Sequence, residues 1–566
     1  MALTKRRGFA EARSDHSDTS ETELLTKDEP RSPSETPQAG SGPGESFCTA
    51  KHAILRSLAA VYAVAFLAAW QQNGALIGEK GLVPAKPAFD RERAAATSAL
   101  EGFMSKPSLF WWLPMDDASL DGVSAAGLAL SLLVLLGLHS SVAMLTLWLL
   151  YFTVVSAAEG SPFYAYGWES QLLETGFLAT FLPLLAPRAA DPPRPVLWLF
   201  RYLAFRISIG AGLIKIRGGS CWEARTCLHY HFETQPVPSP ASFLFHFLPK
   251  WLLSRAVDLD LLVQLYTSWL VLLPGVLQPL RWVRRAAGLE QAGFMLAIAA
   301  SGNFSFLNHL TIIPSLACLD DACWPRALRA APPPLLPAAG VGRAARAARR
   351  GVELLLLGSI LWLSWPVVAN LLQLESSQVM NGSFGAFRLV NTYGAFGSVG
   401  EARYEPIISV SHEGETWHEL DLPCKPGSLT RRPCFCAPYH YRLDWNIWFI
   451  GFKPHRAMLQ RRESWLLVFV ARLLRDDPAA LGLLDASAAT SAAFVDPTDA
   501  TRRRLPRFVK VDMYHYTMAE PLWRLAARWW HDPGAPLVWW RRRFEEPLVP
   551  MMQIDGAGRL ARVVKP

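Results

Sequence analysis

The chain has 566 residues, a formal net charge of +8 and a hydrophobic fraction of 51%, and its mean hydropathy is +0.16. Only 18% of its residues are Asp, Glu, Lys or Arg, whereas an ordinary soluble protein has about 25%. This composition argues against a purely soluble protein and against a disordered one, which would combine low hydrophobicity with high charge. It favours a multi-span membrane protein with soluble parts.

The first 50 residues contain no long apolar run, and residues 31–46 are rich in Ser, Pro and Gly. This pattern predicts a disordered tail over 1–50. The first apolar stretch, 53–70, is long enough to cross a bilayer of about 30 Å as a helix. It is predicted to open a multi-span membrane domain over residues 51–375.

Seven further apolar segments follow the first one. They cover residues 122–138, 140–157, 170–187, 196–214, 259–280, 289–316 and 352–372. The first two of these seven almost touch near Gly137, which leaves two alternatives, a tight hairpin or one long kinked helix. No later run approaches spanning length, so residues 376–566 are predicted to form a separate domain on one side of the membrane.

Basic residues in a short loop indicate the orientation. The segment 324–350 carries six arginines and no acidic residue, which is typical of a cytoplasmic loop. The last apolar segment then carries the chain across, so the C-terminal domain is predicted to be lumenal and the N-terminus cytoplasmic. This requires an even number of crossings before residue 324. Seven apolar segments precede that residue, so at least one of them is not a simple span.

The C-terminal domain changes its periodicity. Strands are expected over 387–399, 405–414 and 416–423, between Gly and charged turns. Apolar spacing at i, i+3, i+4 and i+7 predicts amphipathic helices over 442–452 and 464–476. The expected fold class is therefore a polytopic α-helical membrane protein with a C-terminal lumenal β-rich (α+β) domain.

The last part of the chain is both basic and aromatic. Two arginine runs, Arg502–Arg504 and Arg541–Arg543, stand near two tryptophan pairs. These pairs are Trp529 with Trp530 and Trp539 with Trp540. One interpretation is an interfacial belt against anionic headgroups, so membrane lipid is an expected partner. Nucleic acid is not expected on the lumenal side, despite a pI of about 9.1.

Known catalytic and cofactor motifs are missing from the sequence: it has no Gly-rich phosphate loop, HExxH, GxSxG or CxxC. His229, His231 and Glu233 alternate and would share one face of a strand, where they could ligate a metal. A polar loop is the commoner origin of such a run, so no metal site and no cofactor are assigned.

Ionisable residues lie in or beside two apolar segments. Glu169 and Glu174 flank or enter the segment 170–187, and Arg206 and Lys215 lie in or near the next one. An ionisable side chain at membrane depth is costly and is usually paired or functional. One interpretation is an ion-pair lock that joins the two segments. The other is a catalytic or transport role, since a lysine in an apolar site can lose its proton and act as a general base.

Five sequence blocks together resemble the lipase maturation factor family. They are GWESQLLETGF (167–177), GAGLIKIRGG (210–219), HYHFETQPVPSP (229–240), VNTYGAFGS (390–398) and APYHYRLDWNIWF (437–449). The resemblance extends in order from about residue 50 to 470. It implies a non-enzymatic membrane protein of the endoplasmic reticulum with five spans, which brings lipoprotein lipase, hepatic lipase and endothelial lipase to their folded, dimeric and active form.

A second, shorter resemblance supports an alternative function. Gly212, Lys215 and Trp222 are similar to a motif of the vitamin K-dependent carboxylase group. That group couples a helical membrane bundle to a lumenal β-rich domain and uses a helix lysine as its base. The alternative is therefore a membrane enzyme of this type with Lys215 as base.

A disulfide is expected between Cys424 and Cys434, because the domain is lumenal and the spacer KPGSLTRRP can turn back on itself. The family resemblance also supports this pair. Cys436 could instead compete for Cys424 or stay free. Cys221 and Cys227 are a second candidate pair, provided that the loop after residue 217 is lumenal.

Two glycosylation sequons occur, Asn303-Phe-Ser and Asn381-Gly-Ser. Asn303 lies inside an apolar segment, where a glycan would have to be buried. Asn381 lies on the lumenal side of the expected topology and is the glycosylation candidate.

Overall fold

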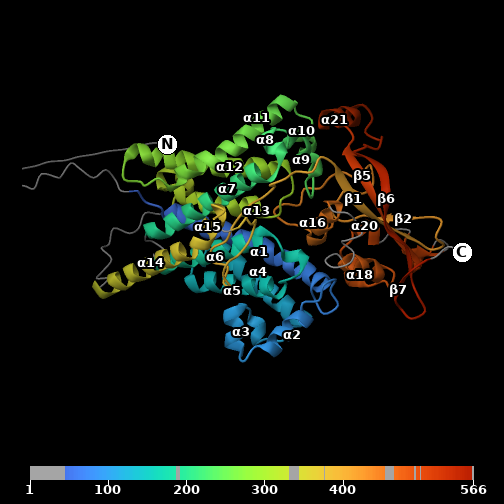
Figure 1. Ribbon diagram of the computed structural model, residues 1–566, viewed down its shortest axis with the longest axis horizontal. Coiled ribbons are helices and arrows are strands. Elements are labelled where there is room, and N and C mark those ends of the chain that lie inside the picture. Colours follow the sequence, from blue (N-terminus) through green and yellow to red (C-terminus); the bar gives the residue numbers. More distant parts are fainter. Residues whose placement is uncertain are drawn as a thin grey trace, which may run out of the picture. The chain divides into compact units, whose positions relative to one another are not determined.

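A computed structural model of the protein describes residues 45–185, 191–330, 343–374, 376–452, 464–489, 493–496 and 499–563. Most of the expected N-terminal tail lies outside these residues. In Figure 1 a bundle of helices leads into an antiparallel sheet, and the short helices α9, α10 and α16 lie between them. We call residues 45–374 the helical part and residues 376–563 the C-terminal part.

Long apolar helices form the helical part. Among the described residues, four stretches are long and apolar enough to cross a membrane: α1 (Cys48–Leu76), α4 (Asp117–Leu135), α7 (Arg194–Gly218) and Ala347–Leu371, which comprises most of α14 (Arg343–Leu363) and all of α15 (Trp365–Leu371). The apolar helix α5 (Ser141–Ala157) is shorter, and α6 (Gly167–Leu185) carries two glutamates. By this measure the described chain has fewer spans than the eight apolar segments or the five spans expected from the family resemblance.

The turn after α4 resolves the first alternative. Gly137 has φ +120, a backbone conformation that favours glycine, and α5 begins four residues later at Ser141. The helices α4 and α5 contact each other along the chain reversal. They therefore form a hairpin and not one kinked helix.

Two of the expected spanning segments are interrupted. The segment 259–280 contains the end of α11 (Lys250–Leu261), a π-helical turn over Leu262–Tyr266 and a 3-10 turn over Thr267–Leu272. The segment 289–316 divides into α12 (Gln278–Ser301) and α13 (Leu307–Ser315), which contact each other. Gly302 permits this break, because a Cβ there would lie 2.0 Å from Oε1 of Gln235.

Because the segment 289–316 divides into two helices, it runs through the bundle twice and not once. The described chain then runs through the bundle an even number of times before residue 324, as α1, α4, α5, α6, α7, the segment from α11 to Leu272, α12 and α13. The start of α1 and residues 321–330 lie at the same end of the bundle. There the backbone N–H of Ala330 donates to the Thr49 hydroxyl at 3.1 Å, and Asp321 accepts from the Thr49 N–H at 2.8 Å.

Short helices connect the long ones. They are α2 (Lys86–Ala95), α3 (Ala99–Ser105), α8 (Ser220–Glu223), α9 (Leu228–Thr234) and α10 (Pro240–His246). Helix α9 corrects the extended conformation considered for His229, His231 and Glu233. Residues two apart do not share a face of a helix. His231 packs against the rings of Phe304 and Phe396, and Glu233 accepts from the backbone N–H of Met518 at 2.7 Å.

The C-terminal part is built on a five-stranded antiparallel sheet in the order β2-β1-β5-β6-β7. Its strands are β1 (Arg403–Ser411), β2 (His418–Leu420), β5 (Phe508–Met518), β6 (Trp540–Ile554) and β7 (Leu560–Arg562). A separate pair joins β3 (Val495–Asp496) to β4 (Asp499–Arg503). The helices are α16 (Arg442–Trp448), α18 (Ser464–Leu473), α19 (Pro478–Leu481), α20 (Ala486–Ala489) and α21 (Leu522–His531). This architecture confirms the β-rich (α+β) prediction.

The positions of the strands differ in part from the expectation. The segments 405–414 and 416–423 contain β1 and β2, but 387–399 is not a strand and has only the isolated bridge between Ser383 and Asn391. Instead, residues 387–399 lie along α6 and α7, where polar contacts fix them. The longest strands, β5 and β6, lie in the region of the arginine runs and tryptophan pairs, for which no strand is expected from the sequence.

The expected basic aromatic surface is divided by the fold. Trp539 and Trp540 are buried, and each ring lies 5.2 Å from the ring of Phe243 in α10. Trp529 and Trp530 are exposed on α21. The two tryptophan pairs therefore do not form one surface, because the first residues of β6 turn inward at the junction with α10.

The hydrophobic core continues from the helical part into the C-terminal part. The ring of Trp445 lies 4.9 Å from that of Trp168, and the ring of Trp465 lies 5.6 Å from that of Phe163. Residues 45–566 accordingly form one compact unit. The packing therefore continues from the helical part into the C-terminal part without a break between two separate cores.

Candidate functional site at the junction of the two parts

Glu169 lies in the first turn of α6, and its side chain is buried at the junction. Arg442, the first residue of α16, is buried too and donates to this carboxylate at 2.7 Å. The Tyr151 hydroxyl and the Trp168 indole N–H also donate to it, the latter at 3.1 Å. The guanidinium lies 3.6 Å from the ring centre of Tyr164. A carboxylate of the helical part is therefore neutralised by an arginine of the C-terminal part.

Glu174 forms the second buried pair, with Arg206 of α7. The other carboxylate oxygen of Glu174 accepts from the Asn391 backbone N–H at 3.1 Å, the Asn391 amide at 3.0 Å and the Tyr393 hydroxyl at 2.7 Å. Arg206 donates to the Asn391 carbonyl at 2.9 Å. The expected link between the two helices is present here, and a segment of the C-terminal part completes it.

Lys215 lies in the last turn of α7 and donates to Asp260 of α11 at 2.5 Å. Its ammonium group lies 4.5 Å from the ring centre of Trp222. The Trp222 indole N–H donates to the carbonyl of Phe396 at 2.9 Å. The lysine is thus buried, paired and covered by an aromatic ring.

These contacts correct the expected pairing for Glu169 and Lys215, which do not pair with each other across α6 and α7. The two helices follow each other through a short connection and run in opposite directions. Glu169 lies five residues before Glu174, whereas Lys215 lies nine residues after Arg206. At about 1.5 Å per residue, this leaves an offset of about 6 Å along the helices. Each group therefore finds its partner on a third element.

A third charged cluster joins β1 to the segment after α9. Glu405 binds Arg403 and lies 2.8 Å from the ammonium group of Lys425. Arg403 donates to the carbonyls of Glu233 at 2.9 Å and Pro236 at 3.1 Å, and Lys425 also donates to Pro236 at 3.1 Å. Burial lowers the pKa of Lys425 to about 8, although the carboxylate of Glu405 opposes this shift.

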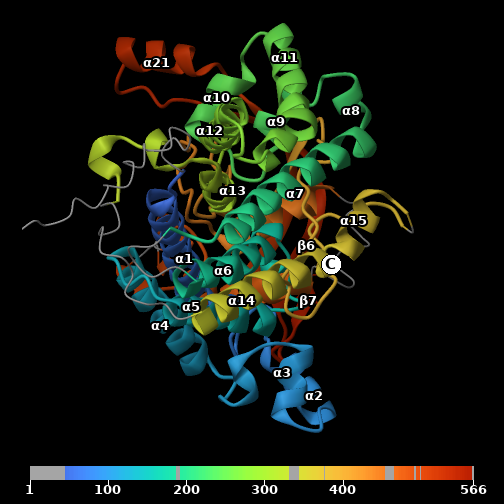
Figure 2. The ribbon, with the colours of Figure 1, turned by 90° about the vertical axis from the view of Figure 1, so that its left-hand side faces the viewer.

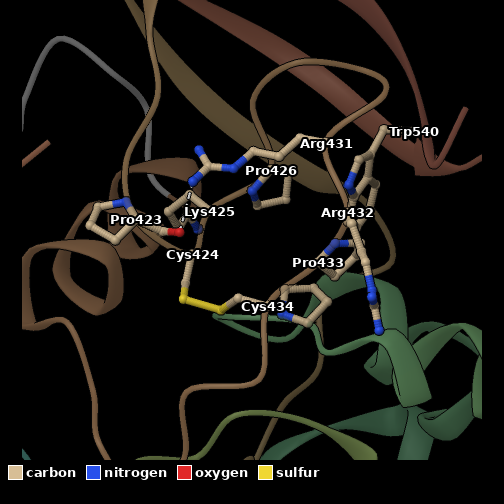
Figure 3. Close-up of a pocket in the computed structure, with 10 residues that line it drawn as sticks. Pro423, Cys424, Lys425, Pro426, Arg431, Arg432, Pro433, Cys434 and Trp540 are labelled. Carbon is tan, nitrogen blue, oxygen red and sulfur yellow. Dashed lines mark hydrogen bonds between the residues drawn. A yellow bond between two sulfur atoms is a disulfide. The ribbon is translucent and has the colours of Figure 1, made fainter. Parts of the chain in front are cut away.

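The disulfide Cys424–Cys434 lies beside this cluster, with its Cα atoms 5.5 Å apart. In Figure 3 the loop between the two cysteines curls back, and Arg431 donates to the carbonyl of Pro423 at 2.8 Å. The backbone N–H of Cys424 donates to Asp444 at 2.6 Å. Burial raises the pKa of Asp444 to about 7.

Cys436 is a free thiol whose sulfur lies within 4.8 Å of the sulfurs of Cys424 and Cys434. Burial raises the pKa of Cys436 to about 12, so the thiol is protonated near neutral pH. Only a thiolate attacks a disulfide, and this thiol is therefore poorly suited to exchange. Cys221 and Cys227 form the second disulfide, with Cα atoms 4.8 Å apart.

Peptide mapping under non-reducing conditions should therefore recover two disulfides, Cys424–Cys434 and Cys221–Cys227, with Cys436 free. The alkylated Cys436 peptide should be recovered in full only after denaturation, since the folded thiol is protonated and partly buried. Recovery of a Cys434–Cys436 or Cys424–Cys436 peptide from the native protein would contradict this assignment and would restore a thiol-exchange role.

The two sequons have different surroundings. Asn303 is buried, and its side chain donates to the carbonyl of Cys434 at 2.8 Å and accepts from the backbone N–H of Cys436 at 2.9 Å. Asn381 is exposed, and its side-chain oxygen accepts from the Gly394 N–H at 3.3 Å. A glycan is thus sterically compatible with Asn381 and incompatible with Asn303.

The roles of several residues of the junction were not predicted from the sequence. These residues are Asp260, Asn303, Asn391, Tyr393 and Arg442. Asp260 and Asn303 stand in apolar surroundings, which is a signal for a buried polar partner. Arg442 belongs to the block PYHYRLDW, but no spacing rule connects it with a glutamate 273 residues earlier.

Comparisons with known proteins agree with this two-part organisation. The family model for the lipase maturation factor transmembrane domain matches residues 49–326, and the model for the lipase maturation factor C-terminal domain matches residues 389–550. Lipase maturation factor 1 of Bos taurus is 38% identical over 515 residues, which cover 86% of this chain and 87% of that protein. Lipase maturation factor 1 of Homo sapiens is 37% identical over 542 residues, which cover 89% and 90%.

Lipase maturation factor 2 of Homo sapiens is more distant, with 26% identity over 615 residues that cover 88% of this chain and 82% of that protein. No solved structure matches the chain. The two matched models account for both the helical bundle and the sheet, in the order in which they occur. The chain therefore belongs to the lipase maturation factor family, and by that membership it is a multi-pass membrane maturation factor and not an enzyme.

Proposed function

We propose that this protein is a membrane factor of the endoplasmic reticulum that brings lipoprotein lipase, hepatic lipase and endothelial lipase to their folded, dimeric and secreted form. The observation that carries the proposal is the match of both parts of the chain to the two lipase maturation factor models. Both disulfides lie at the end of the bundle next to the C-terminal part, which supports the proposal that this end faces an oxidising compartment.

The proposed topology places the N-terminus in the cytoplasm and the C-terminal part in the lumen. Two observations support it. The start of the arginine-rich segment lies beside the N-terminal end of α1, and the chain between the two runs through the bundle an even number of times. The disulfides and the exposed Asn381 belong to the opposite end, where α7 finishes close to residues 396 and 397. Asn381 is accordingly the proposed glycosylation site.

A factor without an energy source can act only by binding immature clients more tightly than finished ones. Such binding keeps immature lipases from aggregating and releases each lipase once it has folded. The buried ion pairs and the continuous core hold the sheet in a fixed position beside the bundle, so that a client meets a pre-formed surface.

The direct test is complementation in cells that lack their own lipase maturation factors. Re-expression of the full chain should restore the activity of each of the three lipases in the medium, and the lipases should sediment as dimers. A secreted lipase that works as a monomer serves as the control and should be unaffected. Unchanged activity of all three lipases, with this protein present at normal level, would reject the proposal.

Lys215 separates this function from the carboxylase-type alternative. Arginine keeps a positive charge beside Asp260 but cannot release its proton in a protein. We therefore expect Lys215→Arg to retain lipase maturation, measured in the same complementation assay. Lys215→Met should lower the protein level, because it leaves Asp260 buried without a cation. Loss of lipase activity in the arginine variant at normal protein level would instead support a basic lysine.

A further inference from the structure

A cavity of about 390 Å³ opens at the junction, away from the ion pairs described above. Its walls come from the end of α3, the last turn of α5 and the loop 383–388. The lining residues used here are Lys106, Ser156, Glu159, Phe384 and Arg388. The volume lies within the range of small-molecule sites, about 300–1,000 Å³.

Two cations and two carboxylates meet at this cavity. The ammonium group of Lys106 donates to Glu92 at 2.9 Å and lies 3.4 Å from Glu159, and Arg388 donates to Glu159 at 3.1 Å. The side chains of Lys106 and Arg388 are only 11% and 18% exposed, whereas those of Glu92 and Glu159 are 43% and 50% exposed. The cations are thus fixed in the wall, and the more exposed carboxylates can turn away when an anion enters.

The cavity lies level with the ends of two apolar helices. Glu159 follows α5 by two residues, and the backbone N–H of Leu109 donates to the Thr153 hydroxyl in the last turns of α5 at 3.0 Å. The spanning helix α4 begins a few residues later, at Asp117. The cavity therefore opens at the boundary between the apolar bundle and the C-terminal part.

Exposed apolar side chains lie on or beside the elements that line the cavity, and we call them its rim. Leu100 and Met104 on α3 are 65% and 56% exposed, Trp112 is 57% exposed, and Phe384 is 48% exposed. The rings of Trp112 and Phe387 each contact Phe103, at 5.4 and 6.2 Å, so the two sides of the rim are held together. In Figure 2 the helices α2 and α3 lie at the lower edge of the molecule, below α14.

We infer that this cavity binds the headgroup of a membrane phospholipid, with the phosphate between Lys106 and Arg388. Charge-assisted hydrogen bonds from these cations suit a phosphate, and basic pockets at the membrane boundary bind lipid headgroups. Tryptophan and leucine at the rim suit the zone where headgroups meet acyl chains. A free anion would use the cations but not the apolar rim.

The test is native mass spectrometry of the full chain, purified in detergent, stripped of lipid and titrated with phosphatidylcholine. The wild type should retain one tightly bound lipid. Lys106→Met with Arg388→Met should weaken its binding about tenfold or more, as expected for the loss of charge-assisted hydrogen bonds. Lys86→Met with Arg91→Met removes the same charge from α2 outside the cavity, where Arg91 is exposed and the Lys86 side chain is 43% exposed, and is the matched control.

A second variant and a second ligand decide between lipid and free phosphate. Trp112→Ser with Phe384→Ser should weaken lipid binding and leave the binding of inorganic phosphate unchanged. Unaltered lipid binding by the Lys106 and Arg388 variant, with an unchanged melting temperature, would overturn the inference. So would inorganic phosphate that binds as tightly as lipid while the rim variant has no effect.

Discussion

Replacing Arg442 with methionine should lower the free energy of unfolding by about 3–5 kcal/mol, the usual cost of breaking a buried ion pair from one side. Glu169 would then keep a charge inside the core with only the Tyr151 and Trp168 donors left. Because Arg442 also donates to the carbonyl of Phe163 at 2.9 Å, that acceptor would lose a partner too. Thermal unfolding of the purified protein and its steady-state level measure the effect.

A double replacement provides the control for this prediction. Arg442→Met with Glu169→Gln removes both charges, and a neutral amide can keep hydrogen bonds to its neighbours, so most of the lost stability should return. Arg543→Met affects an exposed arginine that pairs with Glu545 and should leave unfolding unchanged. Equal unfolding of the Arg442 variant and the wild type would show that the junction does not depend on this pair.

A chain that ends at residue 400 should lose all lipase maturation. It lacks every strand of the five-stranded sheet and also Arg442, which neutralises Glu169. The helical part would still carry its apolar helices and enter the membrane. It would be present at a lower level, because a buried carboxylate and the apolar surface around Trp168 would be uncovered. Secreted lipase activity in the complementation assay and membrane fractionation measure the two effects.

The matched control is a chain that ends at residue 556. It loses only β7, which pairs with the last residues of β6 at the edge of the sheet. Since that strand has only three residues and none of them is fully buried, lipase maturation should be retained. Lipase secretion by the chain that ends at 400 would show that the C-terminal part is dispensable and would refute its proposed role.

Hydrophobicity alone predicted where the longest helices lie, because a helix such as α1 needs a run of about 20 apolar residues wherever it crosses a bilayer. It did not predict how apolar segments are divided. The segment 289–316 is mostly apolar, but Ser301, Gly302 and Asn303 interrupt it where the chain turns, and the close approach of Gln235 leaves no room for a side chain at Gly302. Counting the segment 289–316 as one crossing instead of two made the predicted number of crossings before residue 324 odd.

The strands were harder to predict than the helices. In β5, Val509, Val511 and Met513 alternate as the buried side of a strand, but the register then shifts, and Tyr516 and Met518 continue the buried side on the other parity. This shift obscures a period of two. The neighbouring arginines favoured a surface instead, although Trp539 and Trp540, at the start of β6, are buried in the core.

The charged residues could be located from the sequence, but their partners could not. A glutamate or lysine in an apolar segment signals a partner, whereas the identity of that partner depends on helix offset and on distant segments. Glu174 and Arg206 lie at the same level along α6 and α7, so they pair directly between the two helices. Glu169 and Lys215 do not match, and Arg442 and Asp260 come from elements that no local pattern connects with them.

The hydrogen bonds of Asn303 set an order of events during synthesis. The disulfide Cys221–Cys227 is local and can close as soon as its loop leaves the translocation channel. The loop that carries Cys434 and Cys436 is instead held by Asn303, 131 residues before Cys434, at the turn between α12 and α13. Those helices must already be inserted before the loop finds its place. The nascent bundle thus acts as a template for the C-terminal part, and a fragment made without the bundle has no template on which to complete this loop.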